Sequence, residues 1–212
     1  MTKPHYWDEA ARVLAERDPV LGGLIAAFPG LHLTRRGDPF TTLARAIVGQ
    51  QISLKAAQAI WDRLMAACSD DSPVAKLDPR RVQRKRIATL RACGLSGRKA
   101  EYIRDLAKHF VSVRLDPQTW PALDDEALIE ALIDVKGIGR WTAEMFLMFH
   151  EMRADVLPVD DIGLQKAVAL HYFDGERPTL GELRAFGEKW RPYRSVATWY
   201  LWRSLDPIPV EY

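Results

Sequence analysis

The sequence predicts an all-α protein of about ten short helices. Apolar residues recur at helical spacing along most of the 212-residue chain, and Ser, Thr and Asp stand where helix N-caps belong. No alternating run of useful length predicts a strand. The one extended stretch, residues 154–159, contains Pro158, which cannot donate a hydrogen bond within a central strand.

The expected helices follow one another along the chain, each marked by an apolar stripe, an N-cap or a capping box. In order they are residues 41–50, residues 53–68 after Ser53, a helix opened by Asp78-Pro79 and stopped by Gly94, a helix from Gly97 after Ser96, one opened by Asp124 or Asp125, a hairpin of two helices at 133–150, and one capped by Thr179 with Glu182. The residues before the first of these are also predicted to be helical.

Composition excludes several classes of protein. With 48% hydrophobic and 27% charged residues, the chain can bury a core and is not generally disordered. No apolar run of about 18 residues predicts a membrane span, and the first residues lack the apolar segment of a secretory signal. We therefore expect a cytoplasmic protein, associated with the nucleoid if it is bacterial. Two cysteines, Cys68 and Cys93, are too few for a four-thiolate zinc site or a cysteine-bound iron–sulfur cluster.

Positive charge is concentrated in residues 80–104, which hold nine basic residues and one acid, Glu101. This segment carries a formal charge of +8 and the rest of the chain −6. Such a segment suits a polyanion partner. The alternative is a solvated helix face without a partner, and charge alone favours neither.

Two glycines around one apolar residue, Gly137-Ile138-Gly139, separate the amphipathic halves of residues 133–150. Glycine permits the positive φ of a tight turn and leaves the backbone open to a ligand. The start of the second helix attracts an anion. The pattern predicts a phosphate-binding hairpin with Ile138 packed into the core; an ordinary αα-hairpin is the alternative.

Two aspartates, Asp160 and Asp161, follow the extended segment and open the next predicted helix. A carboxylate at a helix N-terminus is stabilised by free backbone N–H groups, so it stays ionised at neutral pH. Either one aspartate caps the helix while the other takes part in chemistry, or both are caps.

These motifs together carry a family resemblance. The segment VKGIGRWTA, followed 22 residues after its second glycine by Asp161 in LPVDD, resembles the signature of the HhH-GPD DNA glycosylase superfamily. Within it, the chain is most similar to the 3-methyladenine DNA glycosylases of the AlkA type. Three more segments agree, RAIVGQQIS at 45–53, GLSGRKAEYI at 94–103 and WRPYRSVATWYLWR at 190–203, so the resemblance covers residues 40–205.

The resemblance implies a two-lobed HhH-GPD fold with an interlobe cleft. One lobe would comprise residues 40–150 and contain the hairpin, and the other would combine residues 1–39 with 151–212. The N-terminal α/β domain of larger relatives would be absent.

The resemblance also implies a monomeric DNA glycosylase of base excision repair that needs no cofactor. It would flip an alkylated base out of duplex DNA and hydrolyse its N-glycosidic bond. The base would be chiefly 3-methyladenine, with 7-methylguanine or 1-methyladenine as further substrates. Asp161 would be catalytic, because a carboxylate stabilises the cationic sugar formed as the bond breaks. Trp141 stands where bifunctional relatives have the Lys that attacks the sugar, so the enzyme would be monofunctional.

Four residues would line the base pocket: Trp141, Trp202, Met145 and Ile162. Electron-rich ring faces attract a cationic alkylated purine, although either tryptophan could instead be a core residue. Met145 and Ile162 stand where relatives have further aromatic residues, so this pocket would be less aromatic.

The resemblance places DNA contacts at two turns and a wedge. Gln51 would fill the gap left by the flipped base, the alternative being a glutamine that satisfies local backbone groups. The two turns would hold phosphates through Gly97, Arg98 and Lys99 and through Gly137, Ile138, Gly139 and Arg140. A monovalent cation at the hairpin carbonyls near Gly137 and Gly139 would be structural, and no catalytic metal is expected. The rival functions are a non-enzymatic HhH DNA-binding module and a superfamily glycosylase for oxidised or mismatched bases.

Overall fold

The computed structural model describes residues 3–35, 37–69 and 76–205. Within these residues it contains twelve α-helices, two short 3-10 helices and no strand, which confirms the predicted all-α class. The chain divides into two compact units, residues 1–35 with 147–212 and residues 36–146.

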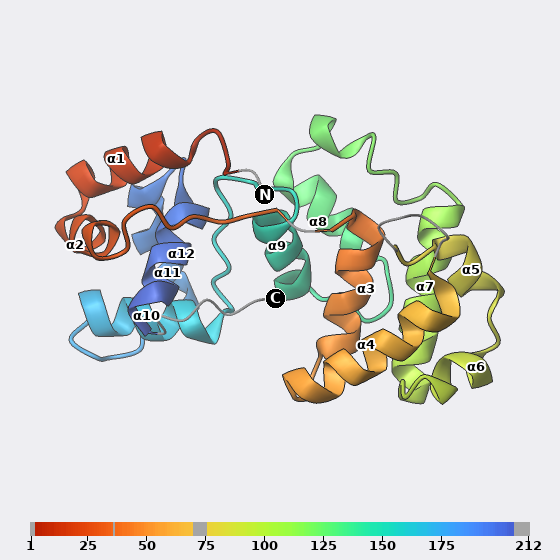
Figure 1. Ribbon diagram of the computed structural model, residues 1–212. Coiled ribbons are helices and arrows are strands. Elements are labelled where there is room, and N and C mark those ends of the chain that lie inside the picture. Colours follow the sequence, from red (N-terminus) through yellow and green to blue (C-terminus); the bar gives the residue numbers. More distant parts are fainter. Residues whose placement is uncertain (1–2, 36, 70–75, 206–212) are drawn as a thin grey trace. The chain divides into compact units, whose positions relative to one another are not determined.

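The unit of residues 36–146 contains the long helix α7 (Gly97–Val111), which lies at the right of Figure 1. The other helices of this unit are α3 (Pro39–Gly49), α4 (Leu54–Cys68), α5 (Pro79–Arg84), α6 (Ile87–Ala92), η1 (Trp120–Ala122), α8 (Asp125–Ile133) and the first part of α9 (Arg140–Phe149). Helices α3, α5 and α6 all pack against α7, and α4 packs against α3. The apolar face of α7, which includes Ile103 and Leu106, is fully buried, so this helix organises the unit.

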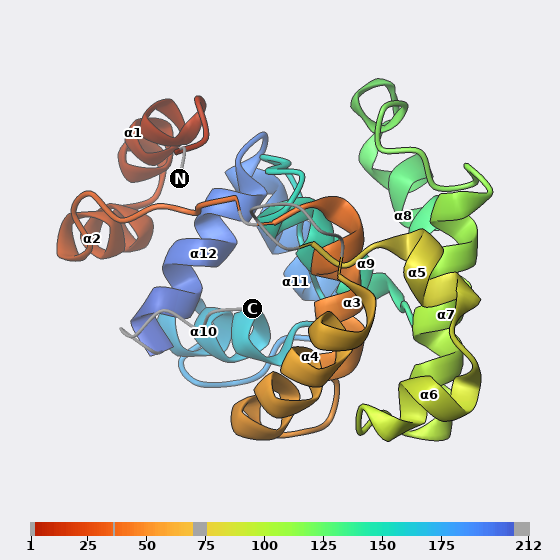
Figure 2. The ribbon, with the colours of Figure 1, turned by 45° about the vertical axis from the view of Figure 1, so that its right-hand side comes forward.

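The unit of residues 1–35 and 147–212 joins the two ends of the chain. Its helices are α1 (Trp7–Arg17), α2 (Pro19–Ala27), the end of α9, α10 (Ile162–Tyr172), α11 (Leu180–Gly187), η2 (Glu188–Trp190) and α12 (Arg194–Leu205). Helix α12 packs against α1, α2 and α10, and Figure 2 shows it running between them. The core of this unit is rich in aromatic residues, with Trp7, Trp199 and Tyr200 in mutual ring contact.

A buried carboxylate ties these terminal segments together. Asp18 caps α2 by accepting hydrogen bonds from the backbone N–H groups of residues 20 and 21. Its Oδ2 atom also accepts from Tyr172 Oη (2.9 Å), Trp190 Nε1 (3.1 Å) and Lys189 Nζ (3.0 Å). Burial alone would raise the pKa of Asp18, but these donors outweigh it and lower the pKa below the usual carboxyl value.

Local sequence signals located the helix starts well. Ser53, Ser96, Asp124 and Thr179 each accept a hydrogen bond from the backbone N–H three residues on, as predicted. The predicted capping box between Thr179 and Glu182 is present in full.

The single helix predicted between Asp78-Pro79 and Gly94 is wrong, because two helices, α5 and α6, occupy that stretch. Lys85 and Arg86 adopt extended backbone conformations, with ψ of 142° and 147°. The Lys85 N–H donates back to the Val82 carbonyl (3.0 Å), which closes α5 before α6 begins. Neither Gly nor Pro marks this break, so sequence signals did not reveal it.

Candidate functional site

Asp161 forms the N-cap of α10, at the position that the sequence indicated. Its Oδ1 atom accepts hydrogen bonds from the Leu164 backbone N–H (2.7 Å) and from the Trp202 indole N–H (2.8 Å). Only 8% of Asp161 is exposed, whereas the neighbouring Asp160 is an exposed residue. The two aspartates are therefore in different environments, and Asp161 is the one fixed in position by directed donors.

The backbone that leads into Asp161 is tied to the helix that follows it. The Gln165 side-chain amide donates to the Val159 carbonyl (2.6 Å), and its own carbonyl oxygen accepts from the Arg177 guanidinium. Gln165 is 2% exposed, so these bonds lie in a dry environment where an unmade one would be costly. They hold the extended segment before Asp161 in place.

Gly163 allows Trp202 to approach Asp161. A Cβ atom at residue 163 would lie 3.0 Å from Asp161 Oδ1 and 3.1 Å from Trp202 Nε1. Both distances are shorter than ordinary van der Waals contact, so a side chain here would push the two functional groups apart. Sequence reasoning missed this role, because nothing in the local pattern indicates which distant residue faces the glycine.

The Trp202 ring makes a second contact besides its hydrogen bond. It stacks on Phe149, with ring centroids 5.9 Å apart and planes inclined by 7°. Ile162, next to Asp161, is 58% exposed. The structure thus brings together two of the predicted site residues, Asp161 and Trp202, with Ile162 beside them on the surface.

The predicted hairpin is a tight turn between α8 and α9. Gly137 has a φ of +85°, and a Cβ atom there would lie only 2.2 Å from the Tyr102 ring, so only glycine fits. Ile138 is 4% exposed, as expected for a residue that packs into the core. Gly139 is exposed, and its backbone adjoins the first turn of α9. This arrangement suits an anion approaching the hairpin backbone.

The first residues of α9 have distinct environments. Arg140 pairs with Glu126 (2.5 Å) and with the buried Glu144 (3.1 Å), so its charge is largely neutralised within the unit. Trp141 is 37% exposed, whereas five of the other six tryptophans are buried. Met145, one turn further along, is buried. Trp141 thus reaches the surface, whereas Met145 is buried, and their places in a base pocket stay predictions.

Gln51 lies in the turn after α3 with a φ of +56°, a conformation that costs a residue with a side chain about 1–3 kcal/mol. Its neighbour Gln50 spans to the hairpin, where its amide donates to the Gly137 carbonyl (3.0 Å). The backbone carbonyl of Gln50 accepts a hydrogen bond from Lys99 Nζ (2.6 Å). The same ammonium group also donates to the backbone carbonyl of Val48 (2.8 Å). These bonds hold the strained turn against the hairpin.

Lys99 thus serves the interior of the unit. Its backbone N–H donates to the Ser96 side chain (3.2 Å), and burial lowers the pKa of its ammonium group. Both groups of Lys99 have partners within the unit, and a phosphate contact at the turn of Gly97, Arg98 and Lys99 stays a prediction. Sequence reasoning missed the roles of Gln50 and Lys99 as supports of Gln51, since the partners are far apart in the chain.

No group of three or more potential metal ligands occurs among the residues that the structure describes. In the same part of the chain, no helix is long and apolar enough to cross a membrane. The Gly137 carbonyl, where a monovalent cation was expected, already accepts the Gln50 hydrogen bond, and the cation itself stays a prediction.

Comparisons with known proteins agree with this geometry. A family model described as HhH-GPD superfamily base excision DNA repair protein matches residues 44–192. DNA-3-methyladenine glycosylase 1 of Schizosaccharomyces pombe is 34% identical over 169 residues, which is 79% of this chain and 72% of that protein. A solved DNA-3-methyladenine glycosidase from Bacillus halodurans is 36% identical with a TM-score of 0.86, covering 97% of this chain and 93% of its own. A Schizosaccharomyces pombe 3-methyladenine DNA glycosylase solved with abasic DNA is 30% identical with a TM-score of 0.78, covering 92% and 96%.

Proposed function

The chain belongs to the HhH-GPD superfamily of base excision DNA repair proteins, as its motifs predicted, and we propose that it excises alkylated bases from duplex DNA. The relatives named as 3-methyladenine glycosylases support 3-methyladenine as the main substrate. We extend the proposal to 7-methylguanine and 1-methyladenine, which like 3-methyladenine carry the positive charge of an alkylated ring.

One observation carries this proposal. A buried carboxylate, Asp161, sits at a helix N-terminus and accepts hydrogen bonds from a backbone N–H and the Trp202 indole. Capping α10 is a role that any helical protein can use, but the second hydrogen bond, from Trp202, fixes this carboxyl group more firmly than capping alone requires. A glycosylase needs such a group, because positive charge develops on the sugar as the N-glycosidic bond breaks.

In the proposed reaction, the positive charge of the alkylated base makes it a good leaving group, and the enzyme stabilises the sugar. The electrons of the N-glycosidic bond leave with the base, whose own positive charge is thereby neutralised, so no strong general acid is required. The Asp161 carboxylate stabilises the cationic sugar and orients the attacking water. The water oxygen bonds to the anomeric carbon, one of its two protons passes to the solvent, and the other stays on the new hydroxyl of the abasic site.

The proposed enzyme does not cut the strand. A lyase of this superfamily attacks the sugar with an amine two positions after the second hairpin glycine. Trp141 occupies that position here and has no nucleophilic amine. Its exposed ring instead suits stacking with a flipped, cationic base, a contact that contributes about 0.5–2 kcal/mol. Trp202, Met145 and Ile162 are proposed as the other pocket residues.

Gln51 is proposed to occupy the space vacated by the flipped base. Gln51 is exposed and lies in a strained turn. Hydrogen bonds from Gln50 to the hairpin and from Lys99 to the Gln50 carbonyl hold this turn in place, which supports the proposed role. Backbone amides at the hairpin, around Gly139, and at the start of α7, around Gly97, are proposed to hold phosphates of the same strand.

The test is release of free bases from methylated duplex DNA, followed by chromatography. We expect methylpurines in the supernatant, with 3-methyladenine released fastest, and strands that break only after treatment with alkali. Binding to the same duplexes with no release from any lesion would favour the non-enzymatic module. Release of oxidised or mismatched bases instead of methylpurines would favour the other branch of the superfamily.

A further inference from the structure

The basic segment at residues 80–104 is explained only in part by the proposed site. Gly97 and Arg98 are assigned to a phosphate turn, and Lys99 supports the turn at Gln51. The remaining positive charge is spread over α5, α6 and the first half of α7, and these helices pack together. A pocket on this surface is lined by one cation of the segment, Arg104, and by two lysines outside it, Lys108 and Lys136.

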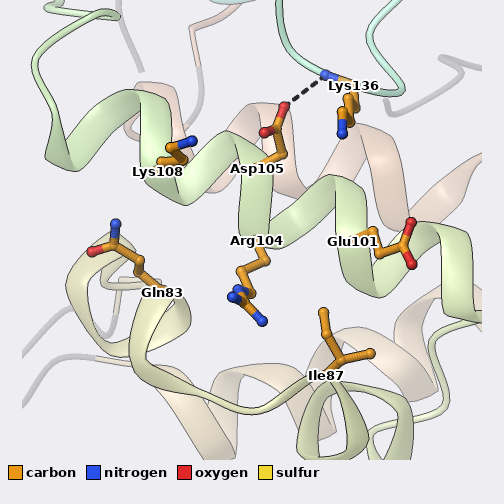
Figure 3. Close-up of a pocket in the computed structure, with 7 residues that line it drawn as sticks. All are labelled: Gln83, Ile87, Glu101, Arg104, Asp105, Lys108 and Lys136. Atoms are coloured by element: carbon orange, nitrogen blue, oxygen red, sulfur yellow. Dashed lines mark hydrogen bonds between the residues drawn. The ribbon is translucent and has the colours of Figure 1, made fainter.

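The pocket has a volume of about 320 Å³ and lies in the unit of residues 36–146. Its walls come from four elements, and the residues that line it are Gln83, Ile87, Glu101, Arg104, Asp105, Lys108 and Lys136. Figure 3 shows Arg104 extending from α7 toward the side where Ile87 lies, with Lys136 of the hairpin on the opposite edge. Three cations thus line one pocket: Arg104 and Lys108 from α7, and Lys136 from the hairpin turn.

The three cations of the pocket share one property. Among the residues that the structure describes, the side chains of Arg104, Lys108 and Lys136 form no hydrogen bond or ion pair. All three belong to exposed residues. Three cations around one pocket outnumber its two carboxylates, and the excess creates a local positive potential that attracts an anion.

Two carboxylates line the same pocket as the three cations, so its formal net charge is +1. Among the described residues, neither carboxylate forms an ion pair with any of the three cations. Asp105 Oδ2 accepts a hydrogen bond from the Lys136 backbone N–H (3.0 Å) and lies 3.7 Å from the ring of the buried His109. Asp105 is therefore committed to holding the hairpin in place, as the dashed line in Figure 3 shows. Glu101 shares the pocket wall without pairing with Arg104, although it is close to it in the helix.

We propose that this pocket binds a backbone phosphate of the DNA duplex, in addition to the phosphates held at the hairpin and at the start of α7. Arg104 offers a planar, bidentate donor set and the two lysines offer point charges, which together match a phosphodiester. Lys136 directly precedes Gly137, so the pocket adjoins the hairpin and a strand held at one can continue to the other. The proposal rests on the proposed function for the identity of the ligand.

The test compares two double variants with the wild type. Arg104→Gln with Lys108→Gln removes two pocket cations, and Arg114→Gln with Arg184→Gln removes the same charge from exposed, unpaired sites elsewhere. The dissociation constant for undamaged duplex DNA is measured over a range of salt concentrations. We expect the pocket variant to bind more weakly and its salt slope to fall by about 0.9, the value for one lost phosphate contact. The control variant should keep the wild-type slope.

Equal losses in both variants, or an unchanged slope in the pocket variant, would overturn the proposal. Thermal unfolding of both variants should match that of the wild type, because the altered residues are exposed. A wild-type protein that releases no base would refute the proposed activity. The salt dependence of DNA binding would still show whether the pocket binds a phosphate.

Discussion

The Trp202 side chain makes two contacts that one substitution can separate. Its indole N–H donates to Asp161 Oδ1 (2.8 Å), while its ring stacks on Phe149. Trp202→Phe removes the donor and keeps an aromatic ring for stacking. A hydrogen bond to a charged group contributes about 1.5–3 kcal/mol. If that bond holds the carboxylate where the sugar cation forms, its loss slows the chemical step by about 10- to 150-fold.

The assay is base release from a duplex with a single lesion under single-turnover conditions, with lesion affinity measured separately. The expected defect lies in the rate at saturating enzyme and not in the affinity, because the ring remains available to the base. A Trp202→Phe rate within twofold of the wild type would refute the positioning argument. A loss confined to affinity would instead make Trp202 a residue that only binds the base.

Three further outcomes follow from the geometry. Gly163→Ala should lower the single-turnover rate at least tenfold with little change in melting temperature, because its Cβ would meet Asp161 Oδ1 at 3.0 Å. Asp18→Asn should destabilise the fold by about 2–3 kcal/mol at neutral pH, measured by denaturant unfolding. The pKa of Asp18 is lower in the folded than in the unfolded protein. The difference in unfolding free energy between wild type and Asp18→Asn should therefore be fully present above the usual carboxyl pKa, and it should disappear as the pH falls through the pKa of the folded state. Lys99→Met should slow base flipping about tenfold, because the turn that carries Gln51 loses the hydrogen bond from Lys99 to the Gln50 carbonyl. The fluorescence of a base analogue beside the lesion measures the rate of flipping.

Features that depend on neighbouring residues were predictable from the sequence. The caps at Ser53, Ser96 and Thr179 follow from side chains that bond to backbone a few residues away, so a local pattern identifies them. The same logic put a carboxylate at the start of α10, where Asp161 lies. Gly137 was also identified locally, because the glycine pair indicates a tight turn.

Features that depend on distant residues were not predictable in this way. The bonds from Trp202 to Asp161 and from Gln50 to the hairpin each join segments that are far apart in the chain. The same holds for Lys99, whose ammonium group donates to the backbone carbonyls of Val48 and Gln50 at the end of α3, about 50 residues away in the chain. The break between α5 and α6 has a different cause: two extended residues interrupt an otherwise helical pattern without any glycine or proline.

The central claim is that Asp161 carries out base excision, and Asp161→Asn tests it most directly. Asparagine keeps a similar shape and can still accept the N–H groups of Leu164 and Trp202, but it lacks the negative charge. Excision of 3-methyladenine from duplex DNA should fall at least about 100-fold under single-turnover conditions, with DNA affinity and melting temperature retained. An Asp161→Asn protein that still releases the base at the wild-type rate would contradict the account.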